Sequence, residues 1–105
     1  MSEKRKPAYD LDAIKGAFSS VDGLRVTGTA LRTAAELGFG RREIVDTIQS
    51  IERRQFVKSM TSYGDHRIWQ DVYHVPSHVG VLYVKFTAHA MAEFVLLSFK
   101  EKDNG

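Results

Sequence analysis

The hydrophobic pattern of this chain changes its period near residue 55, and this change limits the folds open to it. Before that point apolar residues recur at helical spacing, whereas from Gln55 onward apolar and polar residues alternate with a period of two. The connections between the C-terminal segments are too short to hold crossover helices, so neighbouring strands are expected to pair antiparallel. We therefore predict an α+β fold in which N-terminal helices pack on one face of a mainly antiparallel sheet.

Helix boundary signals divide the N-terminal half into three helices and one short strand. The predicted ranges are helices at about 11–20, 30–37 and 41–52, and a strand at 24–27. Asp10 and Thr29 carry side-chain oxygens suited to cap the first two helices. Gly38 stands where a left-handed residue would close the second helix. The apolar residues of the third helix, which include Ile44 and Ile48, are expected to face the core.

The C-terminal half is predicted to contain four strands. Their ranges are about 55–62, 68–75, 80–88 and 93–100. Gly64 with Asp65 marks the first turn, and Pro76 with Gly80 brackets the second connection. The segment 88–92 is expected to be a loop. The strands are thus expected to follow one another as a meander.

The composition is that of one ordinary folded domain. The 105 residues are 43% hydrophobic and 27% charged, which argues against disorder and predicts a single domain over 1–105 with frayed ends at 1–6 and 102–105. The absence of cysteine excludes disulfides, thiolate metal sites and a cysteine nucleophile. No signal-like segment and no apolar stretch of membrane-spanning length is found, so we expect a cytoplasmic protein with no membrane contact.

Alternation in the last two strands indicates a sheet with one apolar face and one polar face. The side chains expected on the apolar face are Leu82, Val84, Phe86, Val95, Leu97 and Phe99. Tyr83 and Lys100 then point to the opposite face, and Lys58 and Gln70 can join them without breaking the alternation. The helices would cover the apolar face, so these four polar side chains are expected to meet on an open one.

These four side chains have the chemistry that binding and cleaving RNA requires. RNA carries its own nucleophile, the 2′-hydroxyl, so cleavage needs a base, an acid and cations that stabilise the charge on the phosphate. Lysines can act as clamp or base, tyrosine can deliver a proton, and an amide can hold a phosphate or a base edge. Further residues expected to bind RNA by charge or base stacking are Tyr63, Arg67, Trp69, Tyr73 and Lys85. Taken singly, a strand lysine is more often a solvated or edge-protecting charge. The hypothesis of an RNA site therefore depends on the four side chains meeting on one face.

Charge and histidine patterns restrict the kind of site further. The net charge is only +2, so an RNA footprint would be short or its positive charge concentrated on one face. His66, His74, His78 and His89 match no metal-binding motif, and Pro76 keeps His74 and His78 from sharing a helix face. We expect no metal and no cofactor.

Several stretches in unbroken order resemble the MqsR family, the motility quorum-sensing regulator toxins. They are EKRKP at 3–7, KSMTSYGDHRIWQDVY at 58–73, YVK at 83–85 and LSFKEK at 97–102. The resemblance implies a RelE-like fold and a toxin of a type II toxin–antitoxin pair. It implies an mRNA endoribonuclease that needs neither metal nor ribosome and cuts at GCU sequences. The family's activity-linked residues match Lys58, Gln70, Tyr83 and Lys100.

The resemblance also implies partners, and the residues leave two other readings open. The implied partners are the mRNA substrate and a zinc-containing antitoxin, MqsA, through which alone the toxin would meet DNA. The segment 74–78 is less basic than the arginine-containing version of the family, and 88–93 is slightly longer. One alternative is a non-catalytic RNA-binding or regulatory module. Another is that the polar face mainly docks the antitoxin.

Overall fold

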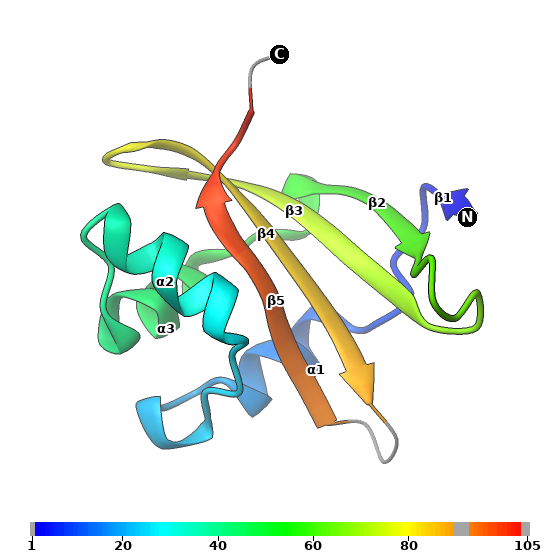
Figure 1. Cartoon of the computed structure of the whole chain (residues 1–105), viewed down its shortest axis with the longest axis horizontal. Coiled ribbons are helices and arrows are strands. Elements are labelled where there is room, and N and C mark those ends of the chain that lie inside the picture. Colours follow the sequence, from blue (N-terminus) through cyan, green and yellow to red (C-terminus); the bar gives the residue numbers. More distant parts are fainter. Residues whose placement is uncertain (1, 90–92, 104–105) are drawn as a thin grey trace.

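The structure, a computed structural model, describes residues 2–89 and 93–103 and confirms the α+β class. Its helices are α1 (Leu11–Ala17), α2 (Gly28–Glu36) and α3 (Arg41–Ser50), with single 3-10 turns η1 (Val21–Gly23) and η2 (Arg53–Gln55). Its strands are β1 (Glu3–Lys4), β2 (Phe56–Thr61), β3 (Trp69–Ser77), β4 (Gly80–His89) and β5 (Glu93–Glu101). They form one antiparallel sheet in sequential order, shown in Figure 1. This meander is consistent with the RelE-like description.

Helices α1 and α2 begin where capping side chains satisfy free backbone N–H groups. The Asp10 carboxylate accepts a hydrogen bond from the Ala13 N–H at 3.1 Å, as the sequence predicts. The cap of α2 is Thr27 and not Thr29, because the Thr27 hydroxyl accepts from the Ala30 N–H at 3.1 Å. Gly38 closes this region with a φ of 87°, in the left-handed conformation expected of it.

The predicted strand at 24–27 is reduced to a single bridge. Val26 forms a parallel bridge with Leu96 of β5, and the Thr27 N–H donates to the Leu96 carbonyl at 3.1 Å. The Thr27 and Thr33 hydroxyls donate to further carbonyls of β5, at 3.2 and 2.6 Å. Thr27 and the α2 residue Thr33 therefore satisfy carbonyl groups along the outer edge of β5.

Three further features of the strands differ from the prediction. β3 continues through Pro76, which pairs with Val81, so the turn lies between Ser77 and Gly80. Proline fits there because it is exposed near the strand end. Gly80, at the end of the turn, takes a φ of 112°, which favours glycine. At the N-terminus, residues expected to fray form β1, which pairs with β2. β4 extends to His89, so part of the predicted loop at 88–92 is strand, and residues 90–92 lie outside the described ranges.

A β-bulge overturns the predicted alternation of β5. Lys85 pairs with Ser98 but Phe86 pairs with Leu96, which leaves Leu97 as an extra residue on β5. Phe99 points to the core as predicted, but on the far side of the bulge the buried residues are Leu96 and Phe94. Val95 and Leu97 are only partly buried, because the extra residue reverses the parity.

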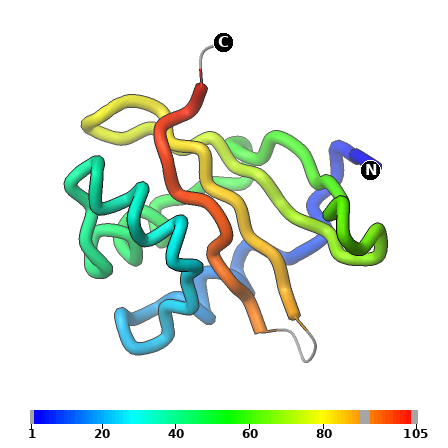
Figure 2. The backbone as a smooth tube through the Cα atoms, in the orientation of Figure 1, coloured from blue at the N-terminus to red at the C-terminus, as the bar shows by residue number. Residues whose placement is uncertain are grey.

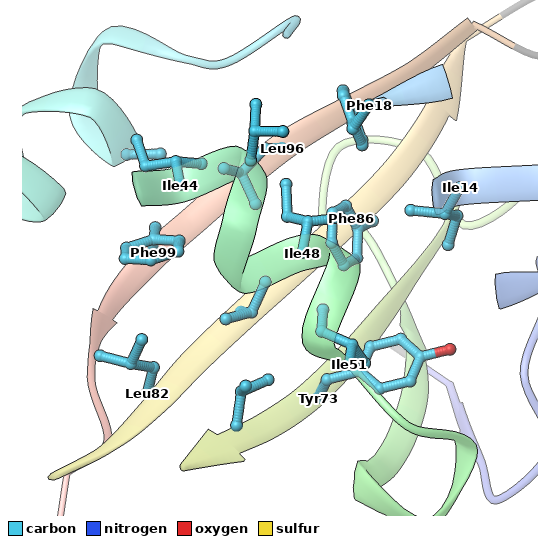
Figure 3. Packing of buried hydrophobic residues seen from close by; sticks show 14 of the residues in the cluster. Ile14, Phe18, Ile44, Ile48, Ile51, Tyr73, Leu82, Phe86, Leu96 and Phe99 are labelled. Carbon is cyan, nitrogen blue, oxygen red and sulfur yellow. The ribbon is translucent and has the colours of Figure 1, made fainter. Parts of the chain in front are cut away.

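The helices cover one face of the sheet and build the core there. Buried residues of all three helices and of β3, β4 and β5 form one cluster. Figure 3 shows Ile44 and Ile48 of α3 over Leu82, Phe86 and Phe99 of the sheet. Within residues 2–89 and 93–103 no helix has the length and apolarity needed to cross a membrane.

The buried carboxyl group of Asp71 ties the N-terminal segment to the middle of the sheet. It accepts hydrogen bonds from the Ala8 N–H at 3.0 Å, the Tyr9 N–H at 3.0 Å and the Ser59 hydroxyl at 2.6 Å. The Tyr9 hydroxyl donates to the Trp69 carbonyl at 2.8 Å beside it. Figure 2 shows the N-terminal segment, in blue, running from α1 to the β2 edge of the sheet. Asp71 thus fixes the path by which β1 reaches β2.

We predict that Asp71→Ala lowers the free energy of unfolding by roughly 3 kcal/mol, because three donors lose a buried acceptor. Chemical denaturation of the purified protein measures this. The matched control Asp46→Ala, which removes an exposed acid of α3, should change stability by less than about 0.5 kcal/mol. Equal stability of the two variants would contradict the anchoring role of Asp71.

Candidate functional site

The sheet face turned away from the helices, called the front face here, carries the polar residues of interest. Register and parity place on it Lys58 and Met60 of β2, Gln70, Val72 and His74 of β3, Tyr83 and Lys85 of β4, and Ser98 and Lys100 of β5. Their strand neighbours, such as Tyr73 and Val84, are buried under the helices. The four residues predicted to meet on an open face, Lys58, Gln70, Tyr83 and Lys100, therefore do share one face.

The front-face residues lie in rows that run across the strands. One row contains Lys58, Val72, Lys85 and Ser98. Val72 is fully buried although it points away from the helix-packed core, and its row neighbours are the two lysines. We interpret this burial as cover by the apolar stems of the lysines, whose ammonium groups can still reach solvent.

The next row contains His74, Tyr83 and Lys100. The Lys100 ammonium lies 5.3 Å from the centre of the Tyr83 ring, and the His74 and Tyr83 rings are 6.1 Å apart between centroids. Gln70 pairs with Thr87, four residues from Tyr83, which is roughly 13 Å along the strand. The lysines, Tyr83 and His74 therefore form one compact group, and Gln70 lies about a nucleotide or two away from it.

Glu3 of β1 supplies a carboxylate to this face. One of its oxygens accepts a hydrogen bond from the Lys58 ammonium at 2.9 Å, and the Lys58 side chain is only 29% exposed. This hydrogen bond and the charge of Lys58 lower the pKa of Glu3. The pair holds Lys58 in place and offers one competing anion where a phosphate could bind.

Partial burial and mutual repulsion change the proton affinities of this group. Burial lowers the pKa of Lys85, and the charges of Lys100 and Lys58 lower it further. Burial raises the pKa of Tyr83, with a smaller opposite effect from Lys58. The tyrosine therefore stays protonated at neutral pH, while the lysines concentrate positive charge around it.

Two aromatic residues predicted to stack on RNA lie on the other side of the sheet. Tyr73 is 1% exposed and packs against Phe56 and Phe86, and burial raises its pKa to about 12. This burial contradicts base stacking by Tyr73. Trp69 is also an odd-numbered residue of β3, so it points to the same side of the sheet as Tyr73. The Lys4 ammonium lies 4.2 Å from the centre of its ring. Odd-numbered residues of β3 point away from Gln70, so the same alternation that placed Gln70 excludes them from the front face.

The other two predicted RNA-binding residues lie in the turn between β2 and β3. Tyr63 is 88% exposed, so its ring is free to meet a ligand. Arg67 is exposed as well, but its guanidinium binds the Asp65 carboxylate at 3.0 and 3.1 Å. These hydrogen bonds lower the pKa of Asp65 to about 2. Both residues lie between the end of β2 and the start of β3, outside the compact group.

A pocket of about 450 Å³ opens elsewhere. It is lined by the segment 6–11 together with Arg53, Phe56 and Tyr73, so it borders the helix side of the sheet. Of the predicted site residues it touches Tyr73 alone. Within the described part of the chain, no group of three or more histidine, cysteine, aspartate or glutamate side chains is placed to hold a metal ion.

Two front-face residues, Glu3 and His74, are not among the predicted site residues. Glu3 lies in a segment expected to fray, and no local pattern shows that a two-residue strand returns to β2 from the distant N-terminus. His74 enters the predictions only through the absence of a metal-binding motif and through the segment 74–78. Its even-numbered position, in line with Gln70 and Val72, was the signal that could have found it.

Two comparisons with known proteins show what the chain is similar to. Residues 6–101 match the family described as motility quorum-sensing regulator, toxin of MqsA. The chain is also 38% identical over 100 residues to the mRNA interferase toxin MqsR of Escherichia coli strain K12. That alignment covers 95% of this chain and 99% of the relative.

We predict that Lys100→Gln raises the pKa of Lys85 toward its ordinary value, because one positive neighbour is lost. NMR titration of the lysine side chains measures this change. Lys15→Gln, a change in α1 on the other side of the sheet, is the control and should leave the Lys85 pKa unchanged. A Lys85 pKa that does not respond to Lys100→Gln would show that the two ammonium groups are not neighbours.

Proposed function

The chain belongs to the MqsR toxin family, and on this premise we propose that its front face binds and cuts single-stranded mRNA. The protein would then be the toxin of a type II toxin–antitoxin pair, an endoribonuclease that uses the 2′-hydroxyl of its substrate as nucleophile. The observation that supports this best is the compact group of Lys58, Lys85 and Lys100 around Tyr83. The relative named mRNA interferase toxin points to the same activity.

The lysines fit the electrostatic part of this reaction. Charge develops on the phosphate oxygens as the 2′-oxygen attacks, and preorganised cations stabilise that charge most where water is partly excluded. Lys58 and Lys85 lie in one row, two strands apart, and Lys100 lies in the adjacent row. A phosphate placed over Val72 would have ammonium groups on more than one side.

Tyr83 and Gln70 fit two further tasks. Tyr83 stays protonated because its pKa is raised, so its hydroxyl is a donor for the phosphate or for the leaving 5′-oxygen. Gln70 is too far along β3 to share that phosphate, which suits it to a neighbouring nucleotide or base edge. We infer that the RNA strand runs along β3 and β4, between Gln70 and Tyr83.

The finer features of the activity follow from the family. We expect cleavage without a metal ion and at GCU-type sequences. We also expect neutralisation by an antitoxin like the MqsA named in the family's description. An antitoxin that covers the front face would block the RNA, and a small protein that co-purifies with the chain is the simplest sign of such a partner.

We predict that the protein cuts a GCU-containing single-stranded RNA in the presence of EDTA. Lys58→Ala should slow cleavage by about 10²-fold or more, because a cation beside the phosphate is lost. Gel analysis of end-labelled RNA with single-turnover kinetics measures both effects. An RNA with 2′-deoxyribose at the cut site should stay intact.

The control for this experiment is Lys15→Ala, which removes a lysine of α1 outside the front face. It should cleave at the wild-type rate. Intact RNA with folded wild-type protein would overturn the proposal. If the wild type and Lys15→Ala then bind RNA without cutting it, the chain is the non-catalytic RNA-binding module.

A further inference from the structure

We propose that His74 is the general base that takes the proton from the 2′-hydroxyl of the RNA. This assignment rests on the proposed function and adds a catalytic residue to it. His74 occupies the front face in the same row as Tyr83 and Lys100, on the central strand of the sheet.

The geometry suits a base paired with an acid across one phosphate. The rings of His74 and Tyr83 are 6.1 Å apart between centroids and tilted by 46°. In a displacement at phosphorus the entering and leaving oxygens lie roughly in line, so base and acid must approach from different sides. Side chains on neighbouring strands, both directed toward the open face, can flank a phosphate in this way.

The imidazole is available to the substrate. It is partly exposed, and within the described residues its ring nitrogens make no hydrogen bond to other protein groups. His78, by contrast, stacks on Phe39 at 5.3 Å between centroids, at the tip of the hairpin. The two histidines therefore stand in different environments and make a matched pair for experiments.

The surroundings of His74 favour its neutral form. Charged and titratable groups of the elements around it are Glu3 of β1, Lys58 of β2, Tyr83 and Lys85 of β4, Lys100 of β5, and Lys102 after β5. Burial lowers the pKa of His74, and the charges of Lys102 and Lys58 lower it further. A lowered pKa means that the ring is unprotonated at neutral pH and can accept a proton.

The other groups on this face are poorer proton acceptors. Tyr83 keeps its proton because its pKa is raised, and the lysines carry ammonium groups, which must lose a proton before they can accept one. Glu3 is a carboxylate, but its oxygen is held by Lys58 and its pKa is lowered, which makes it a weak base. A base works best with a pKa near the working pH, and this condition favours His74.

The proposed cleavage moves one proton to His74 and one from Tyr83. A ring nitrogen of His74 accepts the 2′-hydroxyl proton as the 2′-oxygen forms a bond to phosphorus. The bond from phosphorus to the 5′-oxygen breaks, and that oxygen takes the Tyr83 proton. The products are a 2′,3′-cyclic phosphate and a 5′-hydroxyl end, and the imidazolium proton returns to the Tyr83 phenolate through water.

The test compares wild type, His74→Gln and His78→Gln on a short GCU-containing RNA in EDTA. In the wild type, kcat/KM should fall at acid pH with an apparent pKa below 6.5, because protonation removes the base. His74→Gln should lower kcat/KM by about 10²–10⁴-fold and lose this acid limb. His78→Gln should keep both the rate and the pH profile.

Two further measurements separate catalysis from structure. His74→Gln should bind the uncleavable 2′-deoxy RNA with the wild-type Kd, and added imidazole should partly restore cleavage by His74→Ala. The inference is overturned if His74→Gln cleaves at nearly the wild-type rate with the same acid limb, or if that limb disappears in Glu3→Gln instead. A wild type that leaves the RNA intact overturns the proposed function, and this inference with it.

Discussion

The buried carboxyl group of Asp71 is the interaction on which the front face depends. A carboxyl group without partners in the interior would be costly, so its oxygens must find donors. They find them in two backbone N–H groups of the N-terminal segment and in the Ser59 hydroxyl of β2. This arrangement fixes the N-terminal segment against the sheet, and from there β1 continues along β2 and brings Glu3 to Lys58.

The division of labour between neighbouring residues of β3 follows from the same strand geometry. Asp71 and Tyr73 point toward the helix side and hold the fold, while Gln70, Val72 and His74 point to the front face. Because side chains alternate, an anchor and a ligand-binding group can be adjacent in sequence without competing for space. Anchoring on one side therefore keeps the opposite side in register. The bulges in β2 and β5 adjust that register at the sheet margins, next to Lys58 and Lys85.

Much of the fold could be read from local patterns. The change of period, the cap at Asp10 and the left-handed Gly38 all depend on neighbouring residues, and each prediction is confirmed. Features that depend on distant parts of the chain could not be read in this way. β1 pairs with β2, more than 50 residues away along the chain, and the bulge at Leu97 breaks an alternation that looks regular in the sequence.

For the candidate site, alternation along the strands was the most informative local pattern, although the bulge in β5 limits it. It placed Lys58, Gln70, Tyr83 and Lys100 on one face, and the structure has them there. The same alternation places Trp69 and Tyr73 on the side opposite Gln70, and it places His74 on the front face. Alternation could not predict the position of Glu3, because its hydrogen bond with Lys58 joins residues 55 positions apart and no local sequence pattern indicates it.

The central claim is that the front face, and not the helix side or the pocket beneath the N-terminal segment, holds the RNA. NMR chemical-shift mapping with an uncleavable 2′-deoxy RNA tests it most directly. Signals of Lys58, Tyr83 and Lys85 should shift on titration, and those of α2 and α3 should not. Shifts centred on the helices or on the pocket around Arg53 and Tyr73 would contradict this account.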